Sequence, residues 1–228
     1  MIVEQSKAIV AEVSKALLGK RDVIEKTLMA IYAGGHVLLE DVPGTGKTTL
    51  ALALSRALDL DYKRVQFTPD TMPSDITGFT MYDRDAGEFR FKWGAVNCNL
   101  LLADEVNRTS AKTQAALLEV MEELSITVDG VTHQVPRPFV CIATENPVGS
   151  AGTQPLPESQ MDRFMIRLSV GYPSAADQID ILKAKRYANP LDGIQAKVSR
   201  DDLLEIQNFL GNVQIADSVL EYIVRLCE

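Results

Sequence analysis

The sequence predicts an α/β fold in which a five-stranded parallel sheet is flanked by helices. Two observations carry this prediction. Short apolar runs bounded by turn residues alternate with helical patterns as far as residue 168, as buried parallel strands alternate with their crossover helices. Beyond Gly171 the patterns are helical only, which adds a smaller α-helical domain to the sheet.

Composition limits the classes of protein to which the chain can belong. Its 228 residues suffice for a core domain at 1–172 and a small helical domain at 173–228. The formal net charge of −8 disfavours non-specific nucleic-acid binding. The chain has no apolar run long enough to insert into a membrane. Its three cysteines have neither metal-binding nor disulfide spacing, which favours a reducing, cytoplasmic location.

The individual elements follow from periodicity and turn residues. The five predicted strands lie at residues 37–39, 62–67, 100–103, 139–144 and 164–168. The principal predicted helices lie at residues 2–18, 22–32, 47–58, 110–124, 175–188, 200–210 and 216–228.

Two further segments alternate apolar and polar residues around Asp- and Gly-containing turns, which is typical of β-hairpins. The first hairpin is predicted at 79–93 and the second at 126–135. An edge ribbon of the main sheet is the alternative for the first segment. A projecting insertion is favoured because the hairpin interrupts the alternation of strands and helices.

The loop after the first predicted strand has the composition of a phosphate-binding loop. It consists of Pro43, Gly44, Thr45, Gly46, Lys47, Thr48 and Thr49. Gly44 and Gly46 let the backbone turn its N–H groups toward an anion, and the following helix adds a partial positive charge. Lys47 can reach the β- and γ-phosphates of a nucleotide, and Thr48 can place its hydroxyl on Mg²⁺. A ligand-free tight turn is the alternative, and Lys-Thr at this spacing after a strand argues against it. Asp41 stands where the strict pattern has glycine.

Two carboxylates follow the third predicted strand. Asp104 and Glu105 come after four apolar residues, and ligands gather at the carboxyl ends of parallel strands. Asp104 is therefore a candidate Mg²⁺ ligand, directly or through water. Glu105 is the candidate group for activating an attacking water. A capping or solvated acidic pair is the alternative, which the phosphate-binding loop upstream disfavours.

Other polar residues complete the candidate site. Asn146, just past the fourth strand, can hold the water between Glu105 and the γ-phosphate, although Asn-Pro is also a common turn dipeptide. Arg163 is a candidate for the positive charge that meets the transition state. A structural ion pair with Asp162 or Glu158 is its alternative, and the role of Arg108 is equally open.

The order of these motifs resembles the MoxR family of AAA+ ATPases, within the P-loop NTPases. The matching stretches cover nearly the whole chain and lie at residues 39–48 (Walker A), 67–70, 73–78, 103–108 (Walker B and its extension), 143–147 (sensor 1) and 152–164. The stretches at 103–108 and 152–164 are the most specific. The resemblance implies a Mg²⁺-dependent ATPase that binds ATP and ADP and assembles into a ring, usually of six subunits.

The resemblance also assigns roles to residues. Arg163 corresponds to the arginine finger that acts on a neighbouring subunit's nucleotide, and Leu18 and Gly19 correspond to the adenine-side contact. Both hairpins correspond to insertions that face the central pore. The implied function is chaperone-like remodelling or maturation of a partner protein, including metal-cofactor insertion with a von Willebrand factor A domain partner.

Two departures from the family pattern affect this reading. Glu145 and residues 148–151 differ from the sequence expected around sensor 1. The sensor 2 arginine is expected after the helix at 216–228, so the helical lid is expected to be incomplete. A truncated chain is the favoured explanation. Without the sensor 2 arginine, the chain is expected to bind nucleotide but to hydrolyse it slowly. A nucleotide-dependent scaffold with little turnover and a chelatase-type motor subunit stay open as alternatives, whereas the charge disfavours a nucleic-acid motor.

Overall fold

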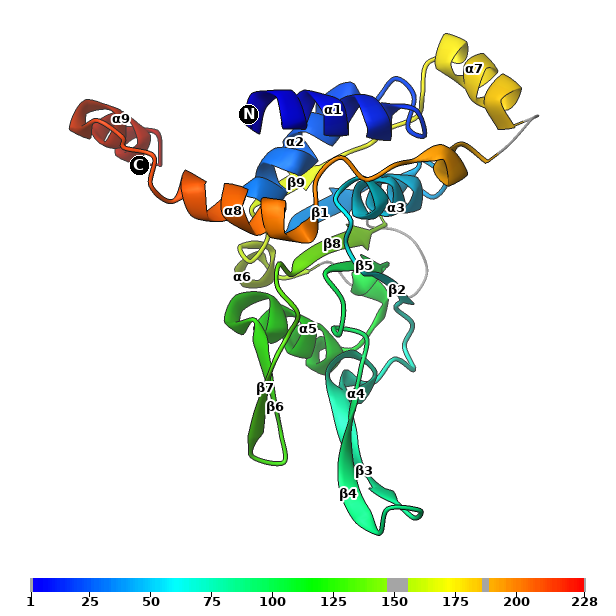
Figure 1. Ribbon diagram of the computed structural model, residues 1–228, viewed down its shortest axis with the longest axis vertical. Helices are drawn as coiled ribbons and strands as arrows, with labels where there is room; N and C mark the ends of the chain where they lie inside the picture. The colour runs from blue at the N-terminus through cyan, green and yellow to red at the C-terminus, as the bar shows by residue number, and fades with distance from the viewer. Residues whose placement is uncertain (1, 147–155, 186–188, 228) are drawn as a thin grey trace.

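The computed structural model describes residues 2–146, 156–185 and 189–227. Its main sheet contains five parallel strands in the order β2-β5-β8-β1-β9 (Figure 1). The strands are β1 (Val37–Glu40), β2 (Tyr62–Gln66), β5 (Leu100–Asp104), β8 (Val140–Glu145) and β9 (Ile166–Leu168). The predicted α/β class and five-stranded parallel sheet are therefore confirmed.

Burial explains the apolar runs of the middle strands, which cover residues 100–103 and 140–143. Every residue of β5 and β8 is buried, because helices cover both faces of the sheet. The strand order reverses around β1, which lies between β8 and β9. The carboxyl ends of β1, β5 and β8 therefore meet at one edge, where open α/β sheets bind their ligands.

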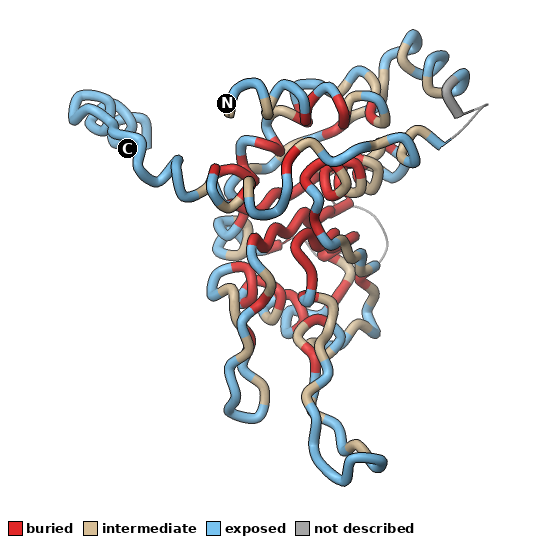
Figure 2. Tube along the Cα trace, in the orientation of Figure 1, coloured by how far each residue is buried: buried red, intermediate tan, exposed pale blue. Residues whose placement is uncertain are grey.

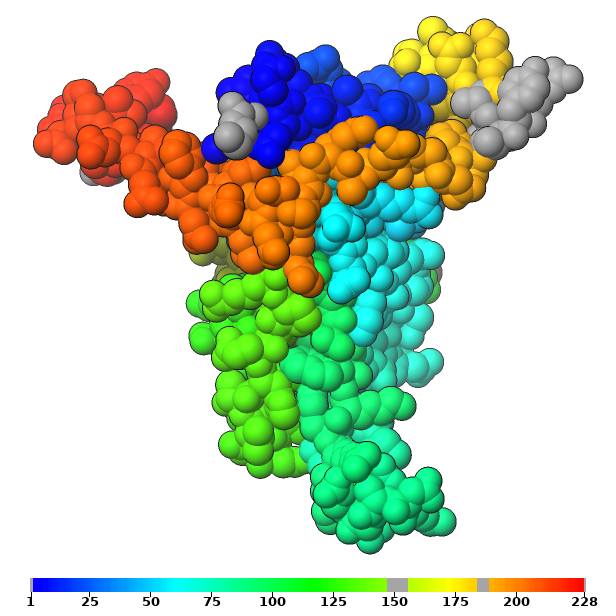
Figure 3. Space-filling model, in the orientation of Figure 1, coloured from blue at the N-terminus to red at the C-terminus, as the bar shows by residue number. Residues whose placement is uncertain are grey.

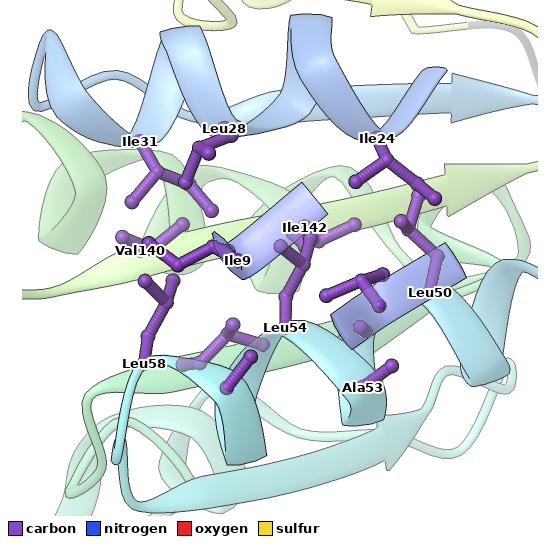
Figure 4. Close-up of a cluster of buried hydrophobic side chains, with 14 of the residues drawn as sticks. Ile9, Ile24, Leu28, Ile31, Leu50, Ala53, Leu54, Leu58, Val140 and Ile142 are labelled. Carbon is purple, nitrogen blue, oxygen red and sulfur yellow. The ribbon is translucent and has the colours of Figure 1, made fainter. Parts of the chain in front are cut away.

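Helices pack on the sheet through two apolar clusters (Figure 2). On one face lie α1 (Ile2–Ser14), α2 (Arg21–Tyr32) and α3 (Lys47–Ala57). Figure 4 shows Ile9, Ile24 and Leu54 from these helices meeting Val140 and Ile142 of β8. On the other face lie α4 (Pro73–Thr77), the short helix η1 (Val106–Arg108) and α5 (Ala111–Glu123).

Two hairpins project from the body on the same side (Figure 1). They are formed by β3 (Gly78–Asp83) with β4 (Glu88–Trp93) and by β6 (Ser125–Val128) with β7 (Val131–Gln134). Each is a separate two-stranded sheet, which confirms projecting insertions over an edge ribbon. The ring of His133 stacks on Phe91 with centroids 3.9 Å apart, so the hairpins contact each other.

Helices make up the C-terminal part of the described chain. They are α6 (Glu158–Met161) before β9, then α7 (Ala175–Lys185), η2 (Pro190–Gly193), α8 (Arg200–Leu210) and α9 (Asp217–Cys227). Leu203 and Ile206 of α8 are buried in the cluster around α2, whereas α9 stands clear of the body with exposed side chains (Figure 3). The domain boundary at residue 172 stays a prediction. In residues 2–146, 156–185 and 189–227, every helix is too short or too polar to span a lipid bilayer.

Candidate active site

The phosphate-binding loop connects β1 to α3, as the sequence predicted. Gly44 has a φ of 87° and Gly46, which caps α3, has a φ of 102°. Both values lie in the left-handed region that favours glycine. The loop therefore delivers the chain to the N-terminus of an eleven-residue helix, whose unpaired N–H groups and dipole attract an anion.

Lys47 lies against the start of its own loop. Its ammonium donates to the backbone carbonyl oxygens of Asp41 and Val42. Burial lowers the pKa of Lys47, although the negative charges of Asp41, Asp104 and Glu105 oppose that shift. The lysine is thus a largely buried cation surrounded by acids, at the entrance of helix α3.

Asp41, the departure from the strict glycine pattern, links the loop to the segment after β9. One carboxylate oxygen accepts from the backbone N–H of Val42 at 2.9 Å. The other accepts from the hydroxyl of Ser169 at 3.1 Å and from the backbone N–H of Gly171. Asp41 therefore fixes the start of the phosphate-binding loop against the connection that leads to α7.

Asp104 is the last residue of β5, and both of its carboxylate oxygens are hydrogen-bonded. The hydroxyl of Thr144, on neighbouring strand β8, donates to Oδ1 at 2.6 Å. Arg64, on the opposite neighbour β2, donates to Oδ2 from Nη2 at 2.6 Å and from Nε at 3.2 Å. Each carboxylate oxygen of Asp104 is thus held by a side chain from a different neighbouring strand.

Glu105 follows in the left-handed backbone conformation, with a φ of 59°. Its Oε1 accepts from Nδ2 of Asn146 at 2.8 Å. Its Oε2 accepts from Gln66 and from Arg108, each at 2.8 Å. Burial alone would raise the pKa of Glu105, but the bonds from Arg108 and Asn146 outweigh it and lower the pKa. The carboxylate is therefore ionised at neutral pH and able to accept a proton.

These side chains line one cavity of about 380 Å³. Its lining residues are Pro43, Gly44, Gly46, Lys47, Thr48, Thr49, Arg64, Gln66, Asp104, Glu105 and Asn146. The structure thus brings together the predicted Lys47, Thr48, Asp104, Glu105 and Asn146.

A second cavity of about 330 Å³ shares Gly44, Gly46 and Thr49 with the first. Leu18 lines it, together with Thr45 of the loop and with Ile181 of α7 and Leu191 of η2. Gly19 lies outside its lining, and a side chain at that position would collide with Asp177 of α7. The two cavities thus both border the phosphate-binding loop, one at the acids and the other at Leu18.

Arg163 lies elsewhere. It precedes β9, so it is at the amino edge of the sheet, opposite the edge where the cavity opens. Its guanidinium pairs with Glu122 of α5, rather than with the Asp162 or Glu158 that the sequence suggested. With 41% of its side chain exposed, Arg163 is not brought to the site of its own chain.

Sequence reasoning missed Arg64, Gln66 and Thr144, all of which contact the two acids. A signal for the first two is present, because Arg64 and Gln66 alternate with Val65 and therefore share one face of β2. Gln66 is in register with Asp104 of β5. The predicted departure at residues 148–151 lies outside the described residues.

The donor set suits Mg²⁺. In the described part of the chain, His, Cys, Asp and Glu side chains form no cluster of three able to hold a metal. Mg²⁺ typically binds through one or two protein ligands together with phosphate oxygens and water. The hydroxyl of Thr48 and the carboxylate of Asp104, which line the same cavity, fit that description.

Comparison with known proteins agrees with the fold. Residues 36–166 match the ATPase family associated with various cellular activities (AAA). YeaC of Bacillus subtilis, an uncharacterized protein, is 46% identical over 96% of this chain and 68% of its own length. Chaperone MoxR1 of Mycobacterium tuberculosis is 40% identical over 94% of this chain, which spans 56% of that protein. A crystal structure of a Cytophaga hutchinsonii protein, provisionally named an ATPase, superposes with a TM-score of 0.89 at 41% identity, over 98% of this chain and 68% of that one. The chain belongs to the MoxR family of AAA+ ATPases.

Proposed function

We propose that the protein binds ATP together with Mg²⁺ in the two cavities that border the phosphate-binding loop and hydrolyses it to ADP and phosphate. One observation carries the proposal: an ionised Glu105, held by Asn146, lines the same cavity as Lys47 and Thr48. A site that only binds nucleotide needs no acid positioned to accept a proton. The arrangement therefore favours hydrolysis over the alternative of a scaffold with little turnover.

The proposed role of each residue follows from its position in the two cavities. Lys47 and the loop N–H groups bind the β- and γ-phosphates, and the cavity next to Leu18 receives the adenine. Thr48 and Asp104 would hold Mg²⁺, which when bound neutralises charge on the phosphates. Glu105 orients the attacking water and accepts its proton, while Asn146 holds the carboxylate and the water in place.

We further propose that hydrolysis takes place in a ring of identical subunits, usually six, with Arg163 acting on the neighbour's ATP. The location of Arg163 at the amino edge of the sheet supports this role, because it cannot serve the cavity of its own chain without a large rearrangement. Its half-exposed ion pair with Glu122 would be exchanged for the partner's phosphate.

The substrate of the ring is proposed to be a protein. Chaperone MoxR1 supports a chaperone-like role, and maturation or metal-cofactor insertion with a von Willebrand factor A domain partner is inferred from the family alone. Exposed apolar side chains on the β3–β4 hairpin, among them Met81, Tyr82 and Phe89, offer a surface for such a partner. The net charge of −8 supports a protein rather than a nucleic acid, and a chelatase-type motor is a variant of the same function.

Nucleotide binding and turnover test the proposal together. The purified protein is expected to bind ATP. It is expected to release phosphate only when Mg²⁺ is present. Lys47→Ala is expected to lose both activities, whereas Lys7→Ala, which removes an exposed pair with Glu4, leaves them unchanged. Tight ATP binding by Lys47→Ala would place the nucleotide site elsewhere.

A further inference from the structure

Arg64 is the one residue of the cavity whose charge the proposed function does not use. It extends from β2, with 46% of its side chain exposed, to an Asp104 side chain that is 12% exposed. Two of its N–H groups donate to the same oxygen, Oδ2, while the hydroxyl of Thr144 takes Oδ1. An ionised carboxylate in so enclosed a position requires a partner, because leaving a buried charge unpaired is costly.

The guanidinium of Arg64 occupies Oδ2, the carboxylate oxygen that Thr144 does not bond. Arg64, Asp104 and Thr48 all line the same cavity. A metal held between Thr48 and Asp104 would therefore meet a second cation already at Asp104, and the two positive charges repel each other. Only one of the two cations can be the close partner of Oδ2.

We propose that Arg64 serves as the counter-ion of Asp104 until nucleotide and Mg²⁺ bind, and that its guanidinium then leaves Oδ2. This inference rests on the proposed function, since it concerns the same nucleotide site. Thr144 keeps its bond to Oδ1 throughout, so the carboxylate stays oriented while its other oxygen changes partner. The phosphate oxygens of a bound nucleotide would offer the displaced guanidinium new acceptors, because Arg64 and the phosphate-binding loop line the same cavity.

Arg64 is thus a positioning residue that sets how strongly nucleotide binding depends on the metal. With Arg64 present, Asp104 is neutralised before the metal arrives, so ADP can enter without meeting a bare carboxylate. Without Arg64, the carboxylate repels the phosphates until Mg²⁺ is bound. The metal then binds more tightly because nothing competes with it for Oδ2.

Equilibrium binding of ADP measures this dependence without any turnover. The dissociation constant of ADP is determined in EDTA and in saturating MgCl₂, and the Mg²⁺ concentration that half-saturates the ADP complex is determined by titration. For Arg64→Gln we expect ADP binding in EDTA to weaken about fivefold, and half-saturation to require about fivefold less Mg²⁺. Binding in saturating MgCl₂ should change by less than about twofold.

Two further variants make the result specific. Arg64→Lys keeps the charge but loses the two-donor geometry, so its Mg²⁺ requirement should lie between those of wild type and Arg64→Gln. Arg21→Gln removes an arginine whose pair with Glu25 lies on the exposed surface of α2, and it should match wild type in every measurement.

Each outcome decides between the alternatives. If ADP binding by Arg64→Gln weakened equally in EDTA and in MgCl₂, Arg64 would only shape the site, and the inference would be wrong. An unchanged or higher Mg²⁺ requirement in both Arg64 variants would also overturn it. Wild-type protein that binds no ADP under either condition would instead contradict the proposed function. Thermal melting of each variant identifies any that fail to fold, and Arg64→Lys then carries the test.

Discussion

The hydroxyl of Thr144 donates to Oδ1 of Asp104 across 2.6 Å. The hydroxyl oxygen of Thr144 also accepts a hydrogen bond from the backbone N–H of Glu105 at 2.9 Å. One fully buried hydroxyl on β8 therefore orients the proposed metal ligand and the backbone of the proposed base together. Thr144 therefore supports both acidic residues, although its own side chain is uncharged.

Replacing Thr144 by valine tests that arrangement. The isosteric change leaves a buried N–H and a carboxylate oxygen without their partner, which costs about 1–3 kcal/mol of unfolding free energy. Turnover should fall by about tenfold or more because Asp104 and Glu105 lose their common support. Thr144→Ser keeps the hydroxyl and should recover most of the turnover. A valine variant with wild-type kcat would remove Thr144 from the site's support.

The trans role of Arg163 predicts complementation. Arg163→Ala and Glu105→Gln should each be inactive alone, because one lacks the finger and the other lacks the base. In mixed rings, an intact Glu105 next to an intact Arg163 forms at about one interface in four, so roughly a quarter of wild-type phosphate release should return. Mixtures that stay inactive although mass measurement shows mixed rings would contradict the shared site.

Glu12 joins α1 to the segment before α8. Its buried carboxylate accepts from Lys15 at 2.7 Å, Lys197 at 3.0 Å and the backbone N–H of Gln195 at 3.1 Å. Burial by itself would raise the pKa of Glu12, but these bonds lower it from 4.5 to about 2. A lowered pKa in the folded state means that the stabilisation is complete above pH 4.5 and is lost as the pH falls toward about 2.

Denaturant unfolding of Glu12→Gln checks this. At pH 7 the free energy of unfolding of the variant should be about 1.5–3 kcal/mol lower than that of wild type. The difference should shrink as the pH is lowered from 4.5 toward 2, because wild-type Glu12 then becomes neutral too. Glu25→Gln, which removes an exposed pair with Arg21, is the matched control and should cost less than about 1 kcal/mol. A difference that is independent of pH would mean that the charge of Glu12 does not stabilise the fold.

The cysteines are expected to differ sharply in reactivity. Burial raises the pKa of Cys98 to about 12 and also raises the pKa of the fully buried Cys141, whereas Cys227 on α9 is exposed. Because only the thiolate reacts, a thiol reagent should label one cysteine rapidly in the native protein and three after unfolding. Rapid labelling of Cys98 or Cys141 would show that the sheet opens easily.

The sequence was sufficient for features that depend on local pattern. The apolar run before Asp104 and Glu105 predicts β5 because a strand buried on both faces cannot alternate. Gly44 and Gly46 predict the loop because their backbone conformations are costly for other residues. Asn146 could be placed near Glu105 because both follow parallel strands.

Features that depend on strand order could not be predicted in the same way. Arg64 and Gln66 resemble ordinary exposed residues of a strand until β2 is seen to pair with β5, and Thr144 needs β8 on the other side. The ion pair of Arg163 with Glu122 was not anticipated, because Glu122 lies 41 positions away in the sequence, on a helix that only tertiary packing brings near. Local periodicity can show that Arg64 and Gln66 share a face of their strand, but it carries no signal for which residues they or Arg163 contact.

Glu105→Gln tests the central claim most directly. The amide keeps the shape of the side chain and one oxygen that can still accept a hydrogen bond, but its NH₂ group cannot accept from a neighbour and the side chain cannot take up a proton. ATP should therefore bind to the variant about as tightly as to wild type, while phosphate release falls by at least about 100-fold. Unchanged phosphate release by Glu105→Gln would contradict the assignment of Glu105 as the base, and with it the proposed mechanism of hydrolysis.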